Sequence, residues 1–466
     1  MSTINVNNLS GRGGATPNLP DGAVISGVAT VTNLKPTNVN VSGAVTATTF
    51  DGSLKSTGTP TLGLGVTINS SGVHVSGICT AGTCFKAGNG AFGPGIGVTI
   101  LGSGDAVLAG VVTATTFVPT VGQLSNRNLM INGAMQVAQR GITTSVTSSY
   151  ACDRYRLTFT NTDEAATIAQ VALTSSDTGP WGVGFRYASQ ITNGNQTSGA
   201  GAADNVFMKY KFEAQDLAQS GWDYTSSSSY VTLSFWVKSS VAQNFYGWIV
   251  TDDGTQQNYP FETGSLTADT WTKITKAIPG NSNITMTNDN SAGLALHLVA
   301  FQGTDYTASG VALDTWAAYA SGTRTPDFTS TWYTTNDSTF AFTGFQLEVG
   351  SVATPFEHRS YGEELTRCQR YYQRWNQGYL AGNSQGSDIN IGVPLIVPLR
   401  AAPTVAALSM HRSGNESVTV SIVGTYYTDL TSTVLRVRTG NWTSMVDETV
   451  YTVQPNSDTM EMSAEL

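Results

Sequence analysis

The N-terminal quarter of this 466-residue chain is built from a short repeated sequence. The motif V-S-G-A-V-T-A-T-T-F around Gly43 recurs with substitutions around Gly77 and Gly110, so the central glycines lie 34 and then 33 residues apart. A second motif, G-V-T-I, begins at Gly65 and again at Gly97. Repeats of this length are typical of stacked supersecondary units. Alternating apolar residues between glycine turns indicate that each unit is a pair of short strands.

One copy of this repetitive segment has too little apolar surface to stabilise itself. Four phenylalanines are the only aromatic residues in residues 1–120. Ordering each residue costs about 1–2 kcal/mol of backbone entropy, whereas burial contributes about 25 cal/mol per Å². Two further copies around a three-fold axis would cover the thin apolar faces, so we predict a homotrimeric β shaft. A flexible Gly/Ser/Thr linker is the alternative, although a linker does not need Val, Ile and Phe at fixed spacing.

Tyrosine and tryptophan appear abruptly after residue 126 and mark the start of a globular region. The chain contains 49 glycines and only 12% charged residues, a balance that suits strands joined by tight turns. Strand-like segments follow one another without a long helix, which predicts an antiparallel sandwich and not a parallel α/β sheet. The predicted strands are Tyr150–Thr160, Ala166–Leu173, Phe185–Ile191, Val206–Phe212, Tyr230–Lys238, Phe245–Thr251, Thr270–Ile278, Leu294–Phe301 and Thr339–Glu348.

A single amphipathic helix is predicted after this region. Apolar residues from Leu365 to Trp375 fall on one helical face. Ser360 and Glu363 fit a capping box, and Glu363 and Arg367 form an i,i+4 pair. We therefore predict a linking helix at residues 359–376, followed by a return to strand patterning.

Several classes of function are disfavoured by composition and motifs. The formal net charge is −9 without a Lys/Arg-rich stripe, so nucleic acid is not an expected partner. No apolar stretch is long enough to cross a bilayer, and the first residues lack a secretory signal, so we expect synthesis in a cytosol. No G-x-S-x-G elbow or phosphate-binding loop is present. We predict no catalytic residue and no cofactor.

Cysteine and histidine residues in the repeats raise the question of a metal ion. Cys79 and Cys84 suggest a metal or disulfide clip, but Cys79 stands where the other repeats carry Val45 and Val112. That position predicts a small buried side chain. His74 on a three-fold axis would bring three imidazoles to one ion. We predict no metal site, because a tetrahedral site needs four ligands and the sequence supplies too few nearby.

Two polar features further along the chain are interpreted structurally. Asp252-Asp253-Gly254 reads as a hairpin turn. His297 lies in the alternating segment L-A-L-H-L-V-A-F and is expected to be a packed, hydrogen-bonded residue.

Aromatic residues in polar loops are the best candidates for ligand binding. Exposed rings stack on sugar faces, while nearby Asp or Asn side chains bond to hydroxyl groups. The alternative is that such rings close the ends of the sandwich or pack against neighbouring chains. Trp236 and Trp271 lie in predicted strands and are expected to be core or concave-face residues. The loop candidates are Trp181, Trp222, Tyr224, Trp316, Trp332 and Tyr333.

Four further motifs lie outside the repeats. Asn128–Gly141 reads N-L-M-I-N-G-A-M-Q-V-A-Q-R-G, and Asp153–Arg156 reads D-R-Y-R. Gly344–Glu357 contains G-F-Q-L-E-V-G, and Cys368–Tyr372 reads C-Q-R-Y-Y. These segments resemble the entry motif, the D-R-W, the closing strand and the segment after it in bacteriophage tail-fibre proteins, especially those of marine and cyanobacterial phages. The V-T-A-T-T-F of the repeats also resembles shaft units of such fibres.

A second resemblance concerns the middle of the chain. Val231–Lys238, V-T-L-S-F-W-V-K, and Trp271–Lys273, W-T-K, are similar to strands of jelly-roll carbohydrate-binding modules. The resemblance implies a jelly-roll sandwich and sugar recognition. It identifies no sugar site, since the binding aromatics of those modules vary in position.

The residues and the resemblances together predict an all-β protein. We expect a repetitive shaft and virion-attachment region at 1–125, a jelly-roll sandwich at 126–358, the linking helix at 359–376 and a small C-terminal β domain at 377–466. The expected function is a structural tail fibre in a phage virion that attaches to the host surface through weak, multivalent glycan binding. The expected partners are two further copies of the chain, a tail or adapter protein at the N-terminal region, and a host glycan. The alternatives are a purely structural fibre or adapter, and an accessory carbohydrate-binding module of a polysaccharide-degrading protein.

Overall fold

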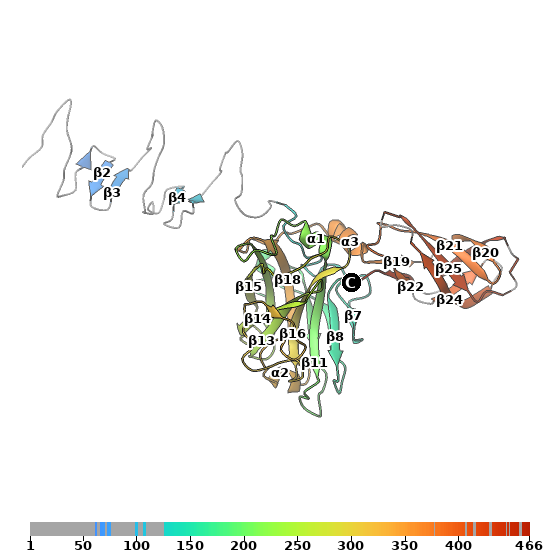
Figure 1. The fold of residues 1–466 in the computed structure, drawn as a ribbon, viewed down its shortest axis with the longest axis horizontal. Coiled ribbons are helices and arrows are strands. Elements are labelled where there is room, and N and C mark those ends of the chain that lie inside the picture. The colour runs from blue at the N-terminus through green and yellow to red at the C-terminus, as the bar shows by residue number, and fades with distance from the viewer. Residues whose placement is uncertain are drawn as a thin grey trace, which may run out of the picture. The chain divides into compact units, whose positions relative to one another are not determined.

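The computed structural model divides the chain into two compact units, residues 1–113 and residues 114–466 (Figure 1). Within the first unit, the structure describes five short strands, β1 to β5. In the second unit it describes residues 125–376, 378–405, 408–412, 416–427, 431–443, 445–446, 448–455 and 459–466.

Short antiparallel hairpins occur in the first unit. Strand β2 (Val66–Asn69) pairs with β1 (Thr61–Leu62) and β3 (Gly72–Val75), and β4 (Val98–Ile100) pairs with β5 (Ala106–Leu108). The two copies of the G-V-T-I motif therefore supply equivalent strands, β2 and β4. The homotrimer remains a prediction. Cys79 and Cys84 lie outside the described residues, as does the side chain of His74.

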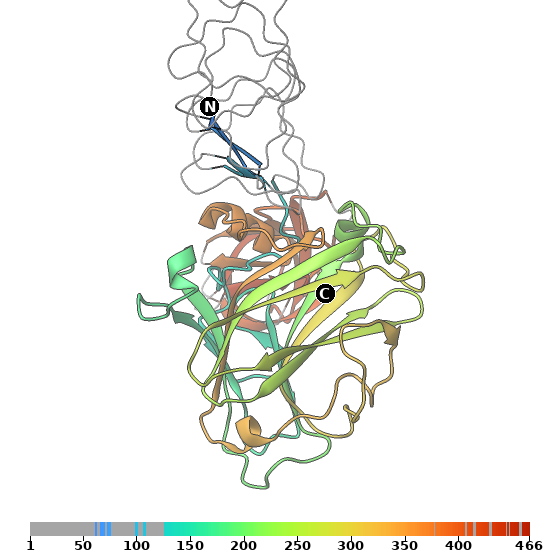
Figure 2. The same cartoon turned by 90° about the vertical axis from the view of Figure 1, so that its left-hand side faces the viewer.

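Two antiparallel sheets form a sandwich in the second unit, as predicted (Figures 1 and 2). The first sheet has six strands in the order β15-β12-β18-β10-β9-β6, and the second has seven in the order β17-β14-β13-β16-β11-β8-β7. The six-stranded sheet consists of β6 (Thr143–Thr144), β9 (Thr167–Ala172), β10 (Tyr187–Thr192), β12 (Tyr230–Ser239), β15 (Thr272–Pro279) and β18 (Thr339–Val349). The seven-stranded sheet consists of β7 (Ser149–Tyr150), β8 (Arg156–Thr160), β11 (Asn205–Glu213), β13 (Asn244–Thr251), β14 (Gln257–Ser265), β16 (Ala292–Gln302) and β17 (Ala317–Ala318).

Alternating apolar residues of both sheets fill the interior. In β16, Leu294, Leu296 and Leu298 all point into one core cluster, as the period of two requires. Phe235 of β12 stacks on Phe345 of β18, with ring centroids 4.8 Å apart and an interplanar angle of 9°. Burying one such side chain stabilises the fold by about 1.5–3 kcal/mol. The sandwich therefore has a core of its own and positions the loops at its ends.

The predicted hairpin turn at Asp252-Asp253-Gly254 is confirmed, but the strand that follows it was not predicted. Gly254 has a φ of +61° between β13 and β14. β14 contains Pro260, which has no N–H to donate and argues against a strand within a sheet. On its outer side β14 pairs with β17 only at Gln257 and Asn258. Among the described residues, no outer strand pairs with Pro260, so its missing N–H costs no hydrogen bond to β17.

The linking helix begins as predicted but is shorter than predicted. In α3 (Tyr361–Gln369), the Ser360 side chain accepts a hydrogen bond from the Glu363 backbone N–H at 3.3 Å. Glu363 and Arg367 form the expected ion pair at 3.1 Å. The continuation to residue 376 is wrong, because Tyr372–Asn376 forms β19 and pairs with β27 (Thr459–Ser463). Tyr and Trp favour strands, and pairing with a distant segment overrides the local helical period.

A closed barrel follows in the C-terminal region. Closure leaves no free strand edge, a common solution in small β domains. The barrel has the order β20-β21-β25-β24-β23-β26, and a separate three-stranded sheet joins β19, β27 and β22 (Thr404–Val405). The barrel strands are β20 (Leu380–Gln385), β21 (Asp388–Pro394), β23 (Leu408–Arg412), β24 (Glu416–Tyr426), β25 (Val434–Gly440) and β26 (Val450–Pro455).

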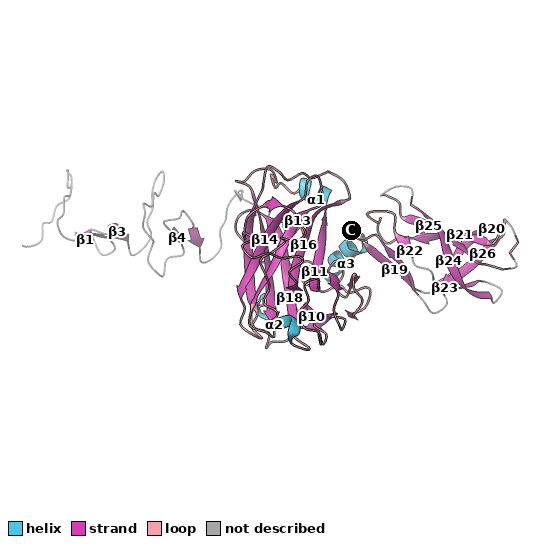
Figure 3. Ribbon diagram, turned by 60° about the horizontal axis from the view of Figure 1, so that its bottom comes forward, coloured by secondary structure: helices cyan, strands magenta, loops and turns pink. Residues whose placement is uncertain are grey.

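Helices are few and short (Figure 3). Besides α3, the structure has α1 (Ala214–Ala218) and α2 (Thr331–Thr334). In the part of the chain that the structure describes, no helix is long and apolar enough to span a membrane. The predicted all-β class is therefore confirmed.

Candidate functional site

Three of the six loop aromatics proposed as ligand contacts are buried. Trp222, Trp332 and Tyr333 are 3%, 0% and 1% exposed, respectively. Trp332 Nε1 donates to the Thr339 carbonyl at 3.0 Å, and Tyr333 stacks on Phe301 with centroids 4.3 Å apart. These rings close the sandwich core, so they have no face free for a sugar. The prediction that these three residues contact a ligand is therefore wrong. The polar residues that flank them in sequence indicate a loop but do not show whether an aromatic ring in that loop is buried.

Two other loop candidates are half-buried and already have aromatic or cationic neighbours. The Arg186 guanidinium lies 3.8 Å from the centroid of the Trp181 ring. Tyr224 packs edge-on against Trp222, with centroids 6.3 Å apart. Neither ring lines the groove beside Trp316 that is described next. Trp181 and Tyr224 are therefore weaker candidates than the remaining aromatic residue, Trp316.

Trp316 borders a groove of about 530 Å³ at an end of the sandwich. The groove is formed where β17, the start of β14 and the loop before β16 come together. None of the side chains around it is charged, and most of them carry a hydroxyl or an amide. Its lining consists of Thr255, Gln257, Ser282, Asn283, Thr285, Trp316, Ala317 and Ala318.

The Trp316 ring is held in place from behind. Its Nε1–H donates to the Pro279 carbonyl at 2.7 Å, and its ring centroid lies 5.2 Å from that of Tyr259. Trp316 is half-buried against the sandwich core, and its indole N–H is satisfied within the protein, so the part of the ring that faces the groove is left for apolar contact. An oriented aromatic ring beside neutral hydrogen-bonding groups suits a polyhydroxylated ligand, which presents both C–H faces and hydroxyls.

The polar side chains of this groove come from separate segments, and the sequence analysis missed them. Gln257 follows the β13–β14 turn, where its N–H donates to Thr251 Oγ1 at 2.8 Å. Asn283 lies in a turn in which its N–H donates to Asn281 Oδ1 at 2.8 Å. Only the pairing of β14 with β17 brings Gln257 close to Trp316. No sequence signal links these residues, because Asn, Gln and Thr are common in every loop of the chain.

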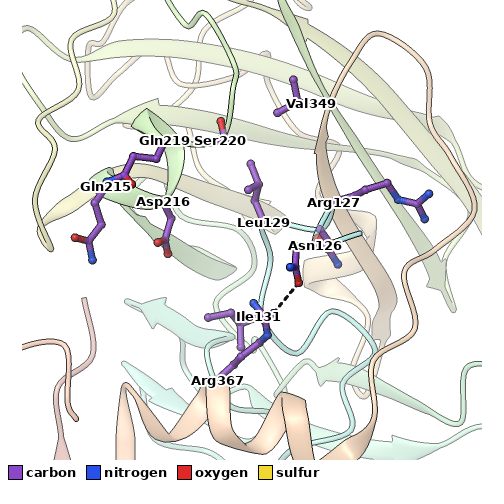
Figure 4. Close-up of a pocket in the computed structure, with 11 residues that line it drawn as sticks. Asn126, Arg127, Leu129, Ile131, Gln215, Asp216, Gln219, Ser220, Val349 and Arg367 are labelled. Atoms are coloured by element: carbon purple, nitrogen blue, oxygen red, sulfur yellow. Dashed lines mark hydrogen bonds between the residues drawn. The ribbon is translucent and has the colours of Figure 1, made fainter. Parts of the chain in front are cut away.

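A second cavity, of about 390 Å³, lies beside the chain segment that enters the sandwich (Figure 4). Its lining consists of Asn126, Arg127, Asn128, Leu129, Ile131, Gln215, Asp216, Gln219, Ser220, Val349 and Arg367. Arg367 donates to Asn126 Oδ1 at 3.1 Å across its floor. The lining contains no aromatic ring, so this cavity lacks a stacking surface for a sugar.

Trp236 and Trp271, predicted as core or concave-face residues, lie half-buried on the outer face of the six-stranded sheet. The Asp177 carboxylate accepts two hydrogen bonds on this face. Trp271 donates one from its Nε1–H at 2.9 Å, and Lys238 donates the other from Nζ at 3.0 Å. Burial alone would raise the pKa of Asp177. The hydrogen bonds from Trp271 and Thr174, together with Lys238, outweigh burial and lower the pKa to about 2.

This depressed pKa predicts a stability contribution that disappears in acid. A carboxyl whose folded pKa lies below its usual 3.8 stabilises the fold above that pH and loses this effect as the pH falls towards 2. We expect Asp177→Asn to lower the free energy of unfolding by up to about 1 kcal/mol at pH 6, because the site is partly exposed to solvent. The difference from the parent protein should vanish near pH 2. Urea unfolding at both pH values tests this. Asp337→Asn, at an exposed position, is the control and should leave the free energy of unfolding unchanged at either pH.

Thiol and metal chemistry have no support among the described residues. No group of three or more His, Cys, Asp or Glu side chains there could hold a metal ion. Cys152 and Cys368 are free and buried. Burial raises the pKa of the Cys152 thiol to about 12 and that of Cys368 well above its usual value, so neither is a thiolate at neutral pH.

The four motifs that resemble tail-fibre segments meet in one buried polar cluster, which we call the motif junction. Asn132 of the entry motif has a φ of +59°. Its Nδ2 donates to the carbonyls of Val137 at 2.9 Å and Asp153 at 3.0 Å. Asn128 Nδ2 donates to the Phe345 carbonyl at 2.9 Å, which ties the entry motif to the closing strand. These contacts satisfy the side-chain amides of Asn128 and Asn132 within the protein.

Two ion pairs complete the motif junction, a buried one at Arg154 and one at Arg370, whose side chain is partly exposed. Arg154 of the D-R-Y-R motif pairs with Glu465 and lies 3.5 Å from the centroid of the Tyr371 ring. Arg370 of the C-Q-R-Y-Y motif donates two hydrogen bonds to Glu213, at 3.0 and 2.9 Å, and Tyr371 Oη donates a third at 2.6 Å. The motif junction therefore joins the sandwich to the C-terminal segment, and its residues have a structural role.

Comparisons with known proteins match the fold only weakly. No protein-family model and no curated protein matches the chain. A putative sugar binding protein from Bacteroides thetaiotaomicron VPI-5482 is 11% identical over 48% of this chain and 100% of its own, with a TM-score of 0.27. TmCBM61, solved with β-1,4-galactotriose, is 10% identical; the match covers 48% of this chain and 98% of TmCBM61, with a TM-score of 0.23. A family 11 carbohydrate-binding module from Clostridium thermocellum is 12% identical; the match covers 46% of this chain and 98% of that module, with a TM-score of 0.21. At these values, no residue, ligand or activity transfers to this chain.

Proposed function

We propose that this chain is a non-catalytic fibre protein that attaches a phage virion to a host-surface glycan. Each copy binds the glycan in the groove beside Trp316. The observation that carries the proposal is the pairing of one oriented indole ring with a lining of neutral hydroxyl and amide side chains. The sequence repeats and the tail-fibre motifs support the fibre part of the proposal.

Weak single-site binding is compatible with this role. A shallow groove with one aromatic ring offers modest affinity, but three grooves on one trimer would act together on a surface that displays many glycans. The trimer would be held by residues 1–125, whose other end we propose to join the tail or an adapter protein.

Removal of the Trp316 ring should weaken glycan binding by about tenfold. A ring that contributes about 1.5 kcal/mol of stacking corresponds to that factor in affinity. The test measures binding of the full chain and of Trp316→Ala to purified host-surface polysaccharide. Trp181→Ala is the matched control, because it removes a half-buried indole that lies outside the groove. Equal losses in the two variants would exclude the groove as the binding site.

A purely structural adapter is the second candidate, and the motif junction favours it. The residues that carry the family resemblance lie in the interior and join parts of the fold, so they give no support for a receptor-binding surface. An intact, folded full chain that binds neither host cells nor host polysaccharide would establish this second candidate. Shortening of the polysaccharide during incubation would contradict both, since each is non-catalytic.

A further inference from the structure

A long loop between β16 and α2, residues 303–328, packs on the outer face of the seven-stranded sheet, and we call it the flap. Its regular structure is limited to β17 and one bridge between Thr307 and Thr325. Gly303, Thr307 and Thr325 are its only buried residues, so no fully buried apolar side chain anchors it. Segments with few buried apolar contacts open at a lower free energy than the core does. The flap is therefore expected to open without unfolding of the sandwich.

The flap rests on two stacked rings, those of Trp248 in β13 and His297 in β16. Their centroids lie 4.1 Å apart with an interplanar angle of 5°, and the two residues are 2% and 5% exposed. Both side chains point away from the interior core, because sequence neighbours such as Leu298 point into it. Tyr319 of the flap packs against the same outer cluster as Trp248. His297 is therefore packed, as predicted, and its cover on the outer side is the flap.

Arg324 connects the stacked rings to the part of the flap that carries Trp316. Its guanidinium carbon lies 5.7 Å from the centroid of the Trp248 ring, and its Nε donates to Tyr319 Oη at 3.1 Å. The Tyr319 N–H donates to the Gln256 carbonyl at 2.9 Å, next to the pairing of β17 with β14. Trp316 directly precedes β17. The contacts of Arg324 are therefore continuous with the segment that holds Trp316 at its groove.

The surroundings of His297 oppose a positive charge on its ring. Its Nδ1 has no hydrogen-bond partner among the described residues. Burial lowers the pKa of His297 well below its ordinary value of 6.5, and three nearby cations lower it further. These cations are Lys209 and Lys211 of β11 and Arg324 of the flap, while β13 contributes the neutral Trp248 and the flap the hydroxyl groups of Tyr306 and Tyr319, which surround Arg324. Lys211 has a counter-ion of its own, Asp252, at 3.4 Å. His297 is therefore uncharged at neutral pH, and its protonation would add a cation to a cluster of cations.

We infer that His297 is a positioning residue for the groove beside Trp316: the uncharged ring lets the flap close, and the protonated ring releases the flap together with Trp316. The inference rests on the proposed function, because this groove is the proposed glycan site. When the flap opens, the exposed imidazole regains its ordinary pKa of 6.5. Above pH 6.5 the ring is uncharged in both states, and the closed flap keeps its full stability. Below pH 6.5 the open state takes up a proton and the closed state does not, so each further pH unit favours the open flap about tenfold, down to the pKa of the closed state.

Hydrogen–deuterium exchange of the full chain at pH 7.5 and at pH 5 tests the inference directly. After correction for the intrinsic exchange rate, peptides from the flap should lose about tenfold or more of their protection at pH 5, while peptides from β12 in the core keep theirs. His297→Phe keeps a ring on Trp248 but cannot take up a proton, so its flap should be equally protected at both pH values. His358→Phe is the matched control, because it removes an exposed histidine outside the flap that packs against other aromatic rings. Its flap should respond to pH as in the parent protein.

Binding of purified host-surface polysaccharide is the second measurement. The affinity of the parent protein should fall about tenfold between pH 7.5 and pH 5, whereas the ratio of the two affinities should stay near one in His297→Phe. If no glycan binds at either pH, the proposed function fails, and exchange in the flap alone decides the inference. The inference is overturned if flap exchange in the parent does not change with pH, if His297→Phe loses as much protection, or if β12 loses protection together with the flap. A flap that opens in acid while glycan affinity stays constant would also overturn it, because His297 would then not position Trp316.

Discussion

Replacing Arg154 with methionine should lower the free energy of unfolding by about 3–5 kcal/mol, the largest effect on stability that we expect from a single substitution. Arg154 is buried within the motif junction, where it pairs with Glu465, donates to the Lys211 carbonyl at 2.6 Å and stacks on Tyr371. Removing one member of a buried ion pair leaves the other charge poorly compensated. The urea midpoint of the full chain measures the change.

The matched control is Arg438→Met in the C-terminal barrel. Arg438 pairs with Asp388 at 2.7 Å, but its side chain is 31% exposed. A pair that is partly open to solvent on both sides contributes about 1 kcal/mol, so the control should move the midpoint much less than Arg154→Met does. Similar losses in both variants would show that the motif junction is no more important for stability than a surface pair.

The second large effect concerns valency. We expect the full chain to have a native mass three times its chain mass of 49.1 kDa. A fragment of residues 114–466, which form a compact unit with their own cores, should be monomeric. Linked weak sites on one particle raise apparent affinity for a multivalent surface by about 10²–10⁴-fold. The full chain should therefore bind glycan-coated surfaces that much more tightly than the fragment.

Two measurements decide between valency and other causes. Light scattering gives the native mass of each protein. Far-ultraviolet circular dichroism of the fragment must show the β-sheet content of its strands, which establishes that the fragment is folded. Binding of both proteins to a soluble, monovalent oligosaccharide should be equal, because each groove beside Trp316 is unchanged. A monomeric full chain, or a fragment that binds the surface as tightly as the full chain, would contradict the trimeric fibre.

The aromatic residues show where prediction from sequence ended. Trp316, Trp332 and Trp222 all stand in polar loops, yet only Trp316 borders a groove, while the other two are buried. Local composition predicts a loop, but burial depends on which segments fold over that loop. The groove beside Trp316 likewise needs the pairing of β14 with β17. β14 was not predicted as a strand, and it contains Pro260, a residue that is unfavourable within a sheet.

The motifs that resemble tail-fibre segments also depend on tertiary contacts. Asn128, Asn132 and Arg154 in these motifs satisfy buried backbone and carboxylate groups. Asn128 and Arg154 have partners more than 200 residues away, Phe345 and Glu465 respectively, whereas the partners of Asn132 lie 5 and 21 residues away. No pattern within a short window indicates the distant partners.

By itself, the sequence determined the all-β class, most strands of the sandwich, the hairpin turn at Gly254 and the start of α3 at Ser360. Each of these depends on residues within a few positions of one another, through alternation, turn geometry or capping. The repeats of residues 1–120 belong to this group as well, and the trimer predicted from them awaits measurement. Only the tertiary structure decided where α3 ends, which rings are buried and how Gln257 and Trp316 come to border one groove. These features depend on strand pairing between distant segments, and a shift of one residue in register would turn every side chain of a strand to the other face.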